Sequence, residues 1–325
     1  MISSIVYGPV PSRRLGYSLG INNIPPKKCP YSCIYCQLGR TSDIQIERRA
    51  FYNPQRVGQR VKERVKQIGE KSESVDYITF VPHGEPTLDI NLGKEIELLR
   101  GLGIKVAVIT NASLVWREDV RQDLQKADWV SLKVDAVTPR IWHSINRPHK
   151  YLKLGTILEG IHKFARAFGG ELTTETMLVR GVNDDLDEVR RVADFLAELR
   201  PDRAYLAIPT RPPAEPVSPA SEQTMNAAYR TFSERLDAVE YLTGYEGNAF
   251  ASTGNVTDDL LGITAVHPMR EEAVTELLNR LGTNRESVQE LIDEGSLVQL
   301  EYQGRRFYAR KLPTRSSISK RRMVT

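Results

Sequence analysis

The chain has 325 residues, which is enough for one large domain of roughly 200 to 250 residues and a second, smaller one. Its 45 basic and 41 acidic side chains leave a net charge of only +4, too balanced to indicate a nucleic-acid partner by itself. No uninterrupted apolar run approaches the roughly 20 residues that span a bilayer, which excludes a membrane-spanning role. The N-terminus has no charged and then apolar leader, and the three cysteines are an odd number, so we expect a cytoplasmic protein without a disulfide framework.

Six short runs rich in β-forming residues alternate with helix-length segments and predict parallel strands. Two of the connecting segments, residues 92–103 and 184–201, have helical periodicity and end in glycine or proline. Alternating strands and helices form either an open doubly wound sheet or a full or partial barrel, and the order of elements alone does not decide between them. The six runs are residues 17–24, 76–84, 105–112, 129–136, 172–181 and 203–211.

Polar residues follow the second to the sixth of these runs at the point where each strand is expected to end. They are His83, Asn111, Asp135, Asn183 and Arg211. In both architectures the chemistry lies at the carboxyl ends of the strands. We therefore expect the functional site at this edge of the sheet.

A proline-rich stretch, residues 209–222, follows the sixth run and indicates a lid or a spacer, and Ser221 is expected to cap the helix after it. Further on, the periodicity predicts two helices and then a hairpin that turns at Gln303 and Gly304. Two helices and a two-stranded wing are typical of a winged-helix module. We expect a large domain over residues 1–250, a winged-helix-like domain over residues 251–313 and a basic, disordered tail over residues 314–325.

All three cysteines, Cys29, Cys33 and Cys36, lie within the eight residues CPYSCIYC. Three thiolates on one short loop can hold three irons of a 4Fe–4S cube and leave the fourth iron without a protein ligand. One alternative is a zinc site with three cysteines and a histidine such as His83. The other is three unrelated buried cysteines, which is the less expected reading because all of them cluster in one loop.

The C-x3-C-x2-C spacing, with Tyr35 before the last cysteine, resembles the signature of the radical S-adenosylmethionine (radical SAM) superfamily. The resemblance implies a partial (β/α)6 TIM-type barrel, and for this reason we expect the barrel rather than the open sheet. It also implies that Cys29, Cys33 and Cys36 hold one 4Fe–4S cluster, whose open iron binds the amino and carboxylate groups of S-adenosyl-L-methionine. Reductive cleavage of that cofactor would give methionine and a 5′-deoxyadenosyl radical.

Two further motifs fall where this superfamily would place them. HGEP resembles the GGEP motif, in which backbone and glutamate, here Gly84 and Glu85, hold an ammonium group. His83 replaces the first glycine of that motif and is either a contact to the substrate or a neutral capping imidazole. Asn111 in TNAS has the donor and acceptor pair suited to the ribose or carboxylate of the cofactor.

The run SLKVDA adds charged candidates. Alternate residues of a strand point the same way, so Ser131, Lys133 and Asp135 are expected to share one face. A buried Lys133 would need an anion, either the carboxylate of the cofactor or a neighbouring acid, and Glu175 is a similar case. The predicted cofactor-binding residues are therefore Tyr35, Gly84, Glu85, Asn111, Lys133 and Asp135.

Four segments resemble the wyosine-synthase-like branch of the superfamily, several members of which are uncharacterised: residues 8–22, 145–150, 180–184 and 207–213. The wyosine enzymes act on a guanine of transfer RNA and carry a second cluster on further cysteines. This chain has no cysteine left for one. RNA, a peptide and a small metabolite all stay open as substrates, and the resemblance implies a reducing partner such as flavodoxin or ferredoxin.

Basic residues suggest where a substrate could bind. Arg13, Arg14 and Arg211 would make the mouth of the barrel cationic and suited to phosphate or carboxylate, unless they only pair with acids at the rim. The second helix of the C-terminal domain is acidic, so we expect no base recognition by it. The hairpin could contact RNA backbone, pair with a peptide as a sheet edge, or serve as a structural cap, and its basic residues are Arg305, Arg306, Arg310 and Lys311.

These observations predict a radical SAM enzyme with an unknown substrate. The alternative from another class is a non-catalytic iron–sulfur regulator that senses redox state and binds nucleic acid through the C-terminal module. A third hypothesis is a zinc-binding interaction protein. A sensor would have no use for HGEP, TNAS and Lys133 converging on an open iron.

Overall fold

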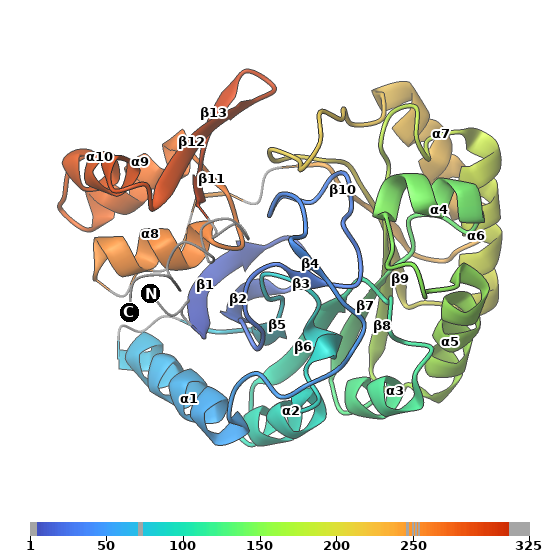
Figure 1. The fold of residues 1–325 in the computed structure, drawn as a ribbon, viewed down its shortest axis with the longest axis horizontal. Coiled ribbons are helices and arrows are strands. Elements are labelled where there is room, and N and C mark those ends of the chain that lie inside the picture. Colours follow the sequence, from blue (N-terminus) through green and yellow to red (C-terminus); the bar gives the residue numbers. More distant parts are fainter. Residues whose placement is uncertain are drawn as a thin grey trace, which may run out of the picture.

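An eight-stranded sheet that curls into part of a barrel forms the centre of the molecule (Figure 1). The computed structural model describes residues 5–70, 74–244, 247–248, 250, 252 and 254–311. All pairs of neighbouring strands in the sheet are parallel except the first, β1 with β2. The strands, in their order across the sheet, are β1 (Val6–Ser12), β2 (Gly16–Ile21), β5 (Tyr77–Phe80), β6 (Lys105–Thr110), β7 (Trp129–Lys133), β8 (Glu171–Met177), β9 (Arg203–Ala207) and β10 (Val239–Leu242).

The six predicted strands are β2, β5, β6, β7, β8 and β9, and they lie side by side in chain order. This confirms the partial barrel and excludes the open doubly wound sheet, whose strand order reverses at a switch point. The sequence did not predict β1 and β10, which extend the sheet at its two edges. The prolines Pro9 and Pro11 in β1 are compatible only with an edge strand. They also interrupt the regular strand pattern, which is why the sequence does not predict β1.

Helices cover the outer face of the curled sheet (Figure 1). Helix α6 (Leu186–Leu199) lies within the segment predicted to be helical, residues 184–201, and its apolar residues at helical spacing, from Val189 to Leu199, are buried. The Ser221 side chain accepts a hydrogen bond from the Thr224 amide and caps α7, as expected. The helices of this part are α1 (Pro54–Glu70), α2 (Leu92–Arg100), α3 (Glu118–Leu124), α4 (Pro139–Asn146), α5 (Leu154–Ala167), α6 (Leu186–Leu199) and α7 (Glu222–Ser233), with the short 3₁₀ helix η1 (Pro86–Leu88).

The C-terminal part of the chain has its own apolar core, which includes Phe250 and residues from Leu260 to Tyr308. Both predicted helices and the hairpin are present, and the turn at Gln303 and Gly304 has positive φ at both residues, as a two-residue hairpin loop requires. We keep the assignment to a winged-helix fold, and the boundary after residue 250, as predictions. The elements are α8 (Val256–Thr264), β11 (Met269–Arg270), α9 (Glu271–Arg280), α10 (Glu286–Asp293), β12 (Leu297–Tyr302) and β13 (Arg305–Arg310).

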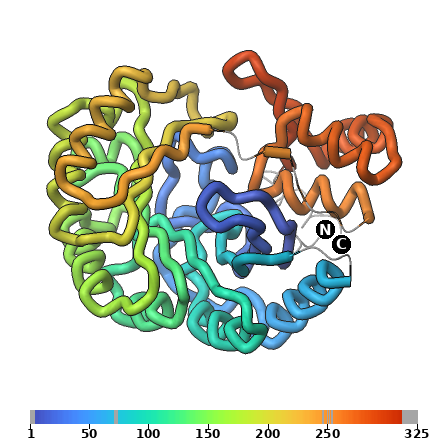
Figure 2. Tube along the Cα trace, turned by 180° about the vertical axis from the view of Figure 1, so that it is seen from behind, coloured from blue at the N-terminus to red at the C-terminus, as the bar shows by residue number. Residues whose placement is uncertain are grey.

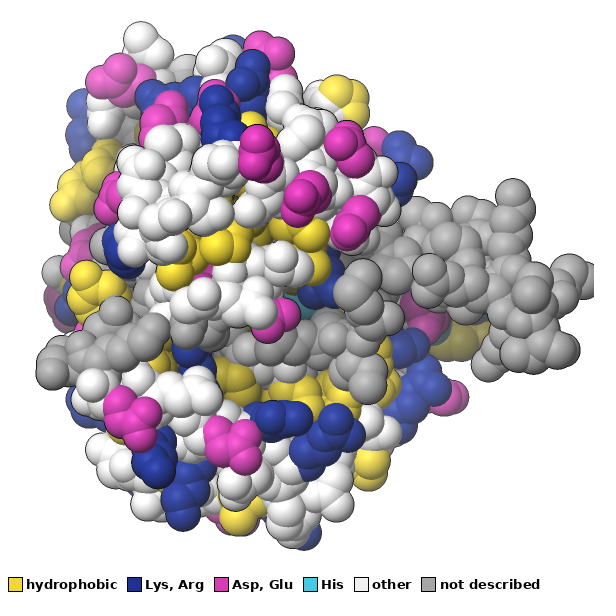
Figure 3. All heavy atoms as spheres, turned by 90° about the vertical axis from the view of Figure 1, so that its left-hand side faces the viewer, with side chains coloured by type: hydrophobic (Ala, Val, Ile, Leu, Met, Phe, Trp, Pro, Cys, Tyr) yellow, Lys and Arg dark blue, Asp and Glu magenta, His cyan; other side chains and the backbone are white. Residues whose placement is uncertain are grey.

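This C-terminal module, residues 254–311, lies against the first strands of the barrel. Figure 2 shows it beside the N-terminal strands, and α8 contacts β1. Figure 3, which looks at this side of the molecule, shows acidic side chains grouped on its upper part. The exposed acids of α10 and of its C-cap are Glu286, Glu290, Asp293 and Glu294. Their charge would repel a nucleic-acid backbone, in keeping with the expectation that this helix does not read bases.

No helix among the described residues is long and apolar enough to cross a membrane. The predicted basic tail, residues 314–325, lies outside the described residues.

Candidate functional site

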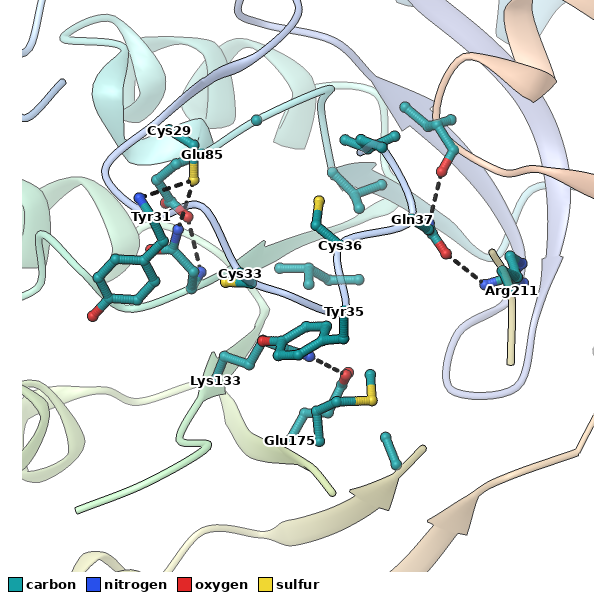
Figure 4. A pocket seen from close by; sticks show the side chains of 18 of the residues that line it. Cys29, Tyr31, Cys33, Tyr35, Cys36, Gln37, Glu85, Lys133, Glu175 and Arg211 are labelled. Carbon is teal, nitrogen blue, oxygen red and sulfur yellow. Dashed lines mark hydrogen bonds and ion pairs between the residues drawn. The ribbon is translucent and has the colours of Figure 1, made fainter. Parts of the chain in front are cut away.

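A cavity of about 320 Å³ opens at the carboxyl ends of the barrel strands. Its walls come from the ends of β5 to β9, from the segment after β1, and from residues 27–41, which cross the mouth of the barrel. Figure 4 shows the side chains that converge there. The site therefore lies where the strand order predicts it.

The cysteine loop, residues 29–36, forms one wall of this cavity. All three cysteines are free thiols and line the same space, around which their side chains project (Figure 4). Two backbone hydrogen bonds hold the loop to the end of α4: Ser32 donates to the Asn146 carbonyl at 3.0 Å and Ile34 to the Ile145 carbonyl at 3.0 Å. The loop is thus anchored from outside while its sulfur atoms face the cavity.

Amide side chains donate to two of the sulfur atoms. Asn111 Nδ2 lies 3.1 Å from Cys29 Sγ, and Asn146 Nδ2 lies 3.4 Å from Cys33 Sγ. Burial raises the pKa of Cys29, and it raises that of Cys33 to about 12, so both are protonated thiols at neutral pH. A metal that binds them must displace these protons, and the amide donors would then stabilise the thiolates.

Glu85 is a buried carboxylate that connects the segment after β5 to the end of β6. Its side chain is 1% exposed and accepts hydrogen bonds from the Thr110 hydroxyl (2.6 Å), the Thr87 hydroxyl (2.6 Å), the Thr87 amide (3.1 Å) and the Asn111 amide (2.8 Å). Three of these four donors share Oε1, so Oε2 keeps capacity for one more donor. Burial raises the pKa of Glu85, and the hydrogen bonds from Thr110, Thr87 and Asn111 oppose that shift.

Gly84 allows the strand end to meet the cysteine loop. A Cβ at this position would lie 2.0 Å from the carbonyl oxygen of Lys28. The two segments are also joined by two backbone hydrogen bonds, from Glu85 to Lys28 (3.0 Å) and from Lys27 to His83 (2.8 Å). Only glycine fits this close approach.

Lys133 and Glu175 form an ion pair on adjacent strands, and Arg14 joins it from the segment between β1 and β2. Lys133 Nζ donates to Glu175 Oε1 at 2.5 Å, and Arg14 donates to the other carboxylate oxygen. All three line the cavity. The structure thus contains the neighbouring acid that the sequence offered as one alternative for Lys133. Burial alone would raise the pKa of Glu175, but the charges of Lys133 and Arg14 lower it to about 2.

Removing this carboxylate should destabilise the protein strongly. In Glu175→Gln, Lys133 and Arg14 stay buried without the carboxylate that they share, and we expect a loss of about 3 kcal/mol in the free energy of unfolding at pH 7, measured with urea. A lowered carboxylate pKa stabilises the fold above the ordinary value of about 4.3, so the loss should be complete there and should shrink as the pH falls toward 2.

The control for this substitution is an exposed ion pair. Asp187 contacts Arg190 on the surface of α6 at 2.7 Å, and Asp187→Asn should cost less than about 1 kcal/mol. An equal loss in the two variants would contradict the buried role of Glu175.

Tyr35, in the cavity wall, is hydrogen-bonded to Asp135. Tyr35 lines the cavity, and its hydroxyl donates to Asp135, which also accepts from Asn146 Nδ2 (2.8 Å) and from the Met177 amide (2.9 Å). Asp135 does not line this cavity but a smaller one of about 20 Å³. The expected shared face of Ser131, Lys133 and Asp135 holds only for the first two, because β7 ends at Lys133 and the alternation of a strand ends with it.

The comparison with known protein families fits this geometry. The family model described as the radical SAM superfamily matches residues 23–196, which include the cysteine loop, Glu85, Lys133 and Glu175. The chain belongs to the radical SAM superfamily.

The chain is similar to several proteins over most of its length or over the barrel. It is 47% identical to the UPF0026 protein MJ1312 of Methanocaldococcus jannaschii over 315 residues, which are 96% of this chain and 98% of that one. A solved structure of TYW1 with a lysine-pyruvate adduct has a TM-score of 0.53 at 16% identity, over 67% of this chain and 74% of that one. A radical SAM methyltransferase from Sphaerobacter thermophilus has a TM-score of 0.51 at 15% identity, over 70% and 66% of the chains. Both structural likenesses show the fold of the barrel.

Radical SAM proteins bind a 4Fe–4S cluster and S-adenosylmethionine, and this chain is an enzyme of that class. Its donor set fits the cluster. Three free thiols line one cavity, and three thiolates can hold three irons of a cube. Membership of the radical SAM superfamily therefore favours this cluster over a zinc site made by the cysteines and His83.

Two buried polar groups beside this radical SAM site have no hydrogen-bond partner among the described residues: the ammonium of Lys27 and both ring nitrogens of His83. Both residues line the cavity. Burial, together with the nearby charges of Arg310 and Lys27, lowers the pKa of His83 to about 3, so the ring is neutral. Unpartnered groups of this kind point to a bound molecule in the space that they face.

Several residues of the site were not predicted from the sequence. Asn146 reaches the site because α4 packs beside the cysteine loop, and Lys27 reaches it from the segment before Cys29. No sequence motif or spacing predicts either residue. Gln37 Nε2 donates to the Val266 carbonyl at 2.7 Å, and its Oε1 accepts from Arg211 at 3.0 Å (Figure 4). Asn183, expected at a strand end, donates to the carbonyl oxygens of Asp135 and Met177 and supports the barrel wall.

Proposed function

We propose that Cys29, Cys33 and Cys36 hold the 4Fe–4S cluster and that the adjoining cavity binds S-adenosylmethionine for reductive cleavage, which starts a radical modification of the substrate. The observation that carries this proposal is the convergence of three free thiols and the ends of five parallel strands on one cavity. When bound, the cluster supplies the electron that breaks a carbon–sulfur bond of S-adenosylmethionine.

The side chains of the cavity suit the charged ends of this cofactor. Glu85 lines the cavity, and its Oε2, which accepts from the Asn111 amide, has room to accept a second hydrogen bond from an ammonium group. Asn111 presents an amide beside Cys29, and the cation of Lys133 stands over the ring of Tyr35 at 5.0 Å from its centre. We propose that Glu85, Gly84 and Asn111 bind the cofactor, that Lys133 neutralises negative charge at its edge, and that Asp135 acts by orienting Tyr35 and Asn146.

The substrate would enter past the basic side chains at the mouth. Arg13, Arg14 and Arg211 line the cavity, which favours a substrate with phosphate or carboxylate groups, such as RNA or a peptide. A reducing partner such as flavodoxin or ferredoxin would supply the electron. A non-catalytic regulator has no support, because a redox sensor does not need a cofactor cavity beside its cluster.

The test is an anaerobic assay of the cluster-reconstituted protein with dithionite and S-adenosylmethionine. We expect 5′-deoxyadenosine to form and the cofactor to change the electron paramagnetic resonance spectrum of the reduced cluster. The proposed reaction would be refuted if the cluster formed but its spectrum did not change when the cofactor was added and no 5′-deoxyadenosine was produced.

A further inference from the structure

Lys27 places a cation in the cavity that the cysteine loop lines. Its ammonium nitrogen is buried, lines the cavity, and has no hydrogen-bond partner among the described residues. The loop closes over it at Gly39, where an added Cβ would lie 3.2 Å from that nitrogen. Its backbone amide donates to the His83 carbonyl at 2.8 Å, which fixes the start of the side chain.

The other charged groups of the cavity do not compensate this ammonium. Lys133 and Arg14 share Glu175, which already serves two cations. His83 is neutral and carries no compensating charge. Arg310, which lowers the pKa of His83, is a further cation, and it donates to the Leu261 carbonyl.

Among the described residues, Glu85 is the remaining carboxylate of the cavity, and it accepts its hydrogen bonds from Thr87, Thr110 and Asn111. Cys29 and Cys36 line the same cavity as Lys27, and the amide of Gly39, the residue beside the ammonium, donates to the Cys36 carbonyl at 3.0 Å. The anion that would balance Lys27 is therefore expected at the cysteine loop.

The backbone at this position does not favour lysine. Lys27 has φ of +64°, in the left-handed region that glycine and asparagine adopt most easily. A lysine held in this conformation, with its ammonium in the cavity that the cysteines line, is explained by a role of the side chain rather than by the turn.

We propose that Lys27 is a positioning residue that raises the reduction potential of the cluster by placing a positive charge beside Cys29 and Cys36. The inference rests on the proposed function only in that the cluster binds at the three cysteines. Reduction would add one electron to the cluster and break no bond, so the total negative charge of the cluster would increase by one. A fixed cation in a buried site favours the state with more negative charge.

The test is a dithionite titration of the reconstituted protein, followed by electron paramagnetic resonance. Lys27→Met keeps the length of the side chain and removes its charge, and we expect the equilibrium constant for reduction to fall at least tenfold, which is about 59 mV for one electron. Lys27→Arg keeps the charge and should restore most of the potential.

The matched control is the next residue. Lys28 does not line the cavity, and its ammonium pairs with Asp43 at 2.5 Å, so Lys28→Met should leave the potential unchanged. If Lys27→Met takes up no cluster, Lys27→Asn, which suits the left-handed backbone, is titrated instead with the same expected shift.

The outcomes separate this inference from the proposed function. A full complement of iron and sulfide with an unchanged potential in the neutral variants would overturn the role of Lys27. An equal shift in the Lys28 variant would overturn it too, because the effect would then follow overall charge rather than position. Failure of the wild-type protein to bind a cluster would instead count against the proposed function.

Discussion

Cys33→Ala is expected to abolish both cluster binding and the formation of 5′-deoxyadenosine. Cys33 lies in the middle of the cysteine loop, and with it lost only two thiols would face the cavity. The three cysteines are the whole supply of the chain, so no other thiol can replace the missing ligand. Iron and sulfide analysis after anaerobic reconstitution, together with chromatography of the reaction products, measures both losses.

The fold should survive this substitution, because Cys33 contributes one small side chain at the edge of the core. Ser32→Ala is the neighbouring control: the Ser32 hydroxyl accepts from the Thr41 amide at 3.2 Å and does not line the cavity. The control should bind iron as the wild type does. If Cys33→Ala kept a full 4Fe–4S cluster, the assignment of the ligands would be wrong.

Gly84→Ala is expected to damage the site through packing alone. The added methyl group would lie 2.0 Å from the Lys28 carbonyl oxygen, so the end of β5 and the cysteine loop would have to separate. Overpacking of this kind typically costs about 1–3 kcal/mol, and here it would also break the hydrogen bonds that hold Lys27 and Glu85 to the opposite segment. We expect a lower melting temperature and a large fall in the iron bound per chain.

Gly58→Ala is the matched control in the middle of α1. An added Cβ there would be 3.9 Å from the nearest atom, the Cβ of Leu98, which is an ordinary contact. Because glycine weakens a helix interior, this variant should be more stable than the wild type by roughly 0.5–1 kcal/mol. A Gly84→Ala variant that melted and bound iron like Gly58→Ala would show that the close approach to Lys28 is not required.

The six inner strands could be predicted because they are buried and regular, and the barrel was preferred over the open sheet because the cysteine spacing resembles the radical SAM signature. The edge strands β1 and β10 could not, since β1 contains prolines and only one of the four residues of β10, Leu242, is buried. In the site, the cysteines and Glu85 were visible in local motifs. Asp135 shows the limit of local rules: alternation along β7 predicts its direction only while the strand lasts, and the strand ends two residues earlier.

Residues that act through contacts between distant segments had no local signal at all. Lys27 is close to the cysteines in the chain, but nothing in its neighbours reveals a buried ammonium. Asn146 lies at the end of α4, 113 positions later in the chain than Cys33, and donates a hydrogen bond to its sulfur atom. Such contacts depend on how the segments pack, which the order of residues in one segment does not contain.

The bridge made by Gln37 limits how this protein can be divided or recombined. Its side chain joins the cysteine loop to Arg211 at the end of the barrel and to the Val266 carbonyl in the C-terminal module, while Arg211 also meets His267 at 3.0 Å. The region matched by the superfamily model ends at residue 196, before three of these four positions. A chimera that exchanges C-terminal modules between relatives would therefore have to transfer residues 37, 211 and 266–267 as one set, because they are connected by hydrogen bonds to one another.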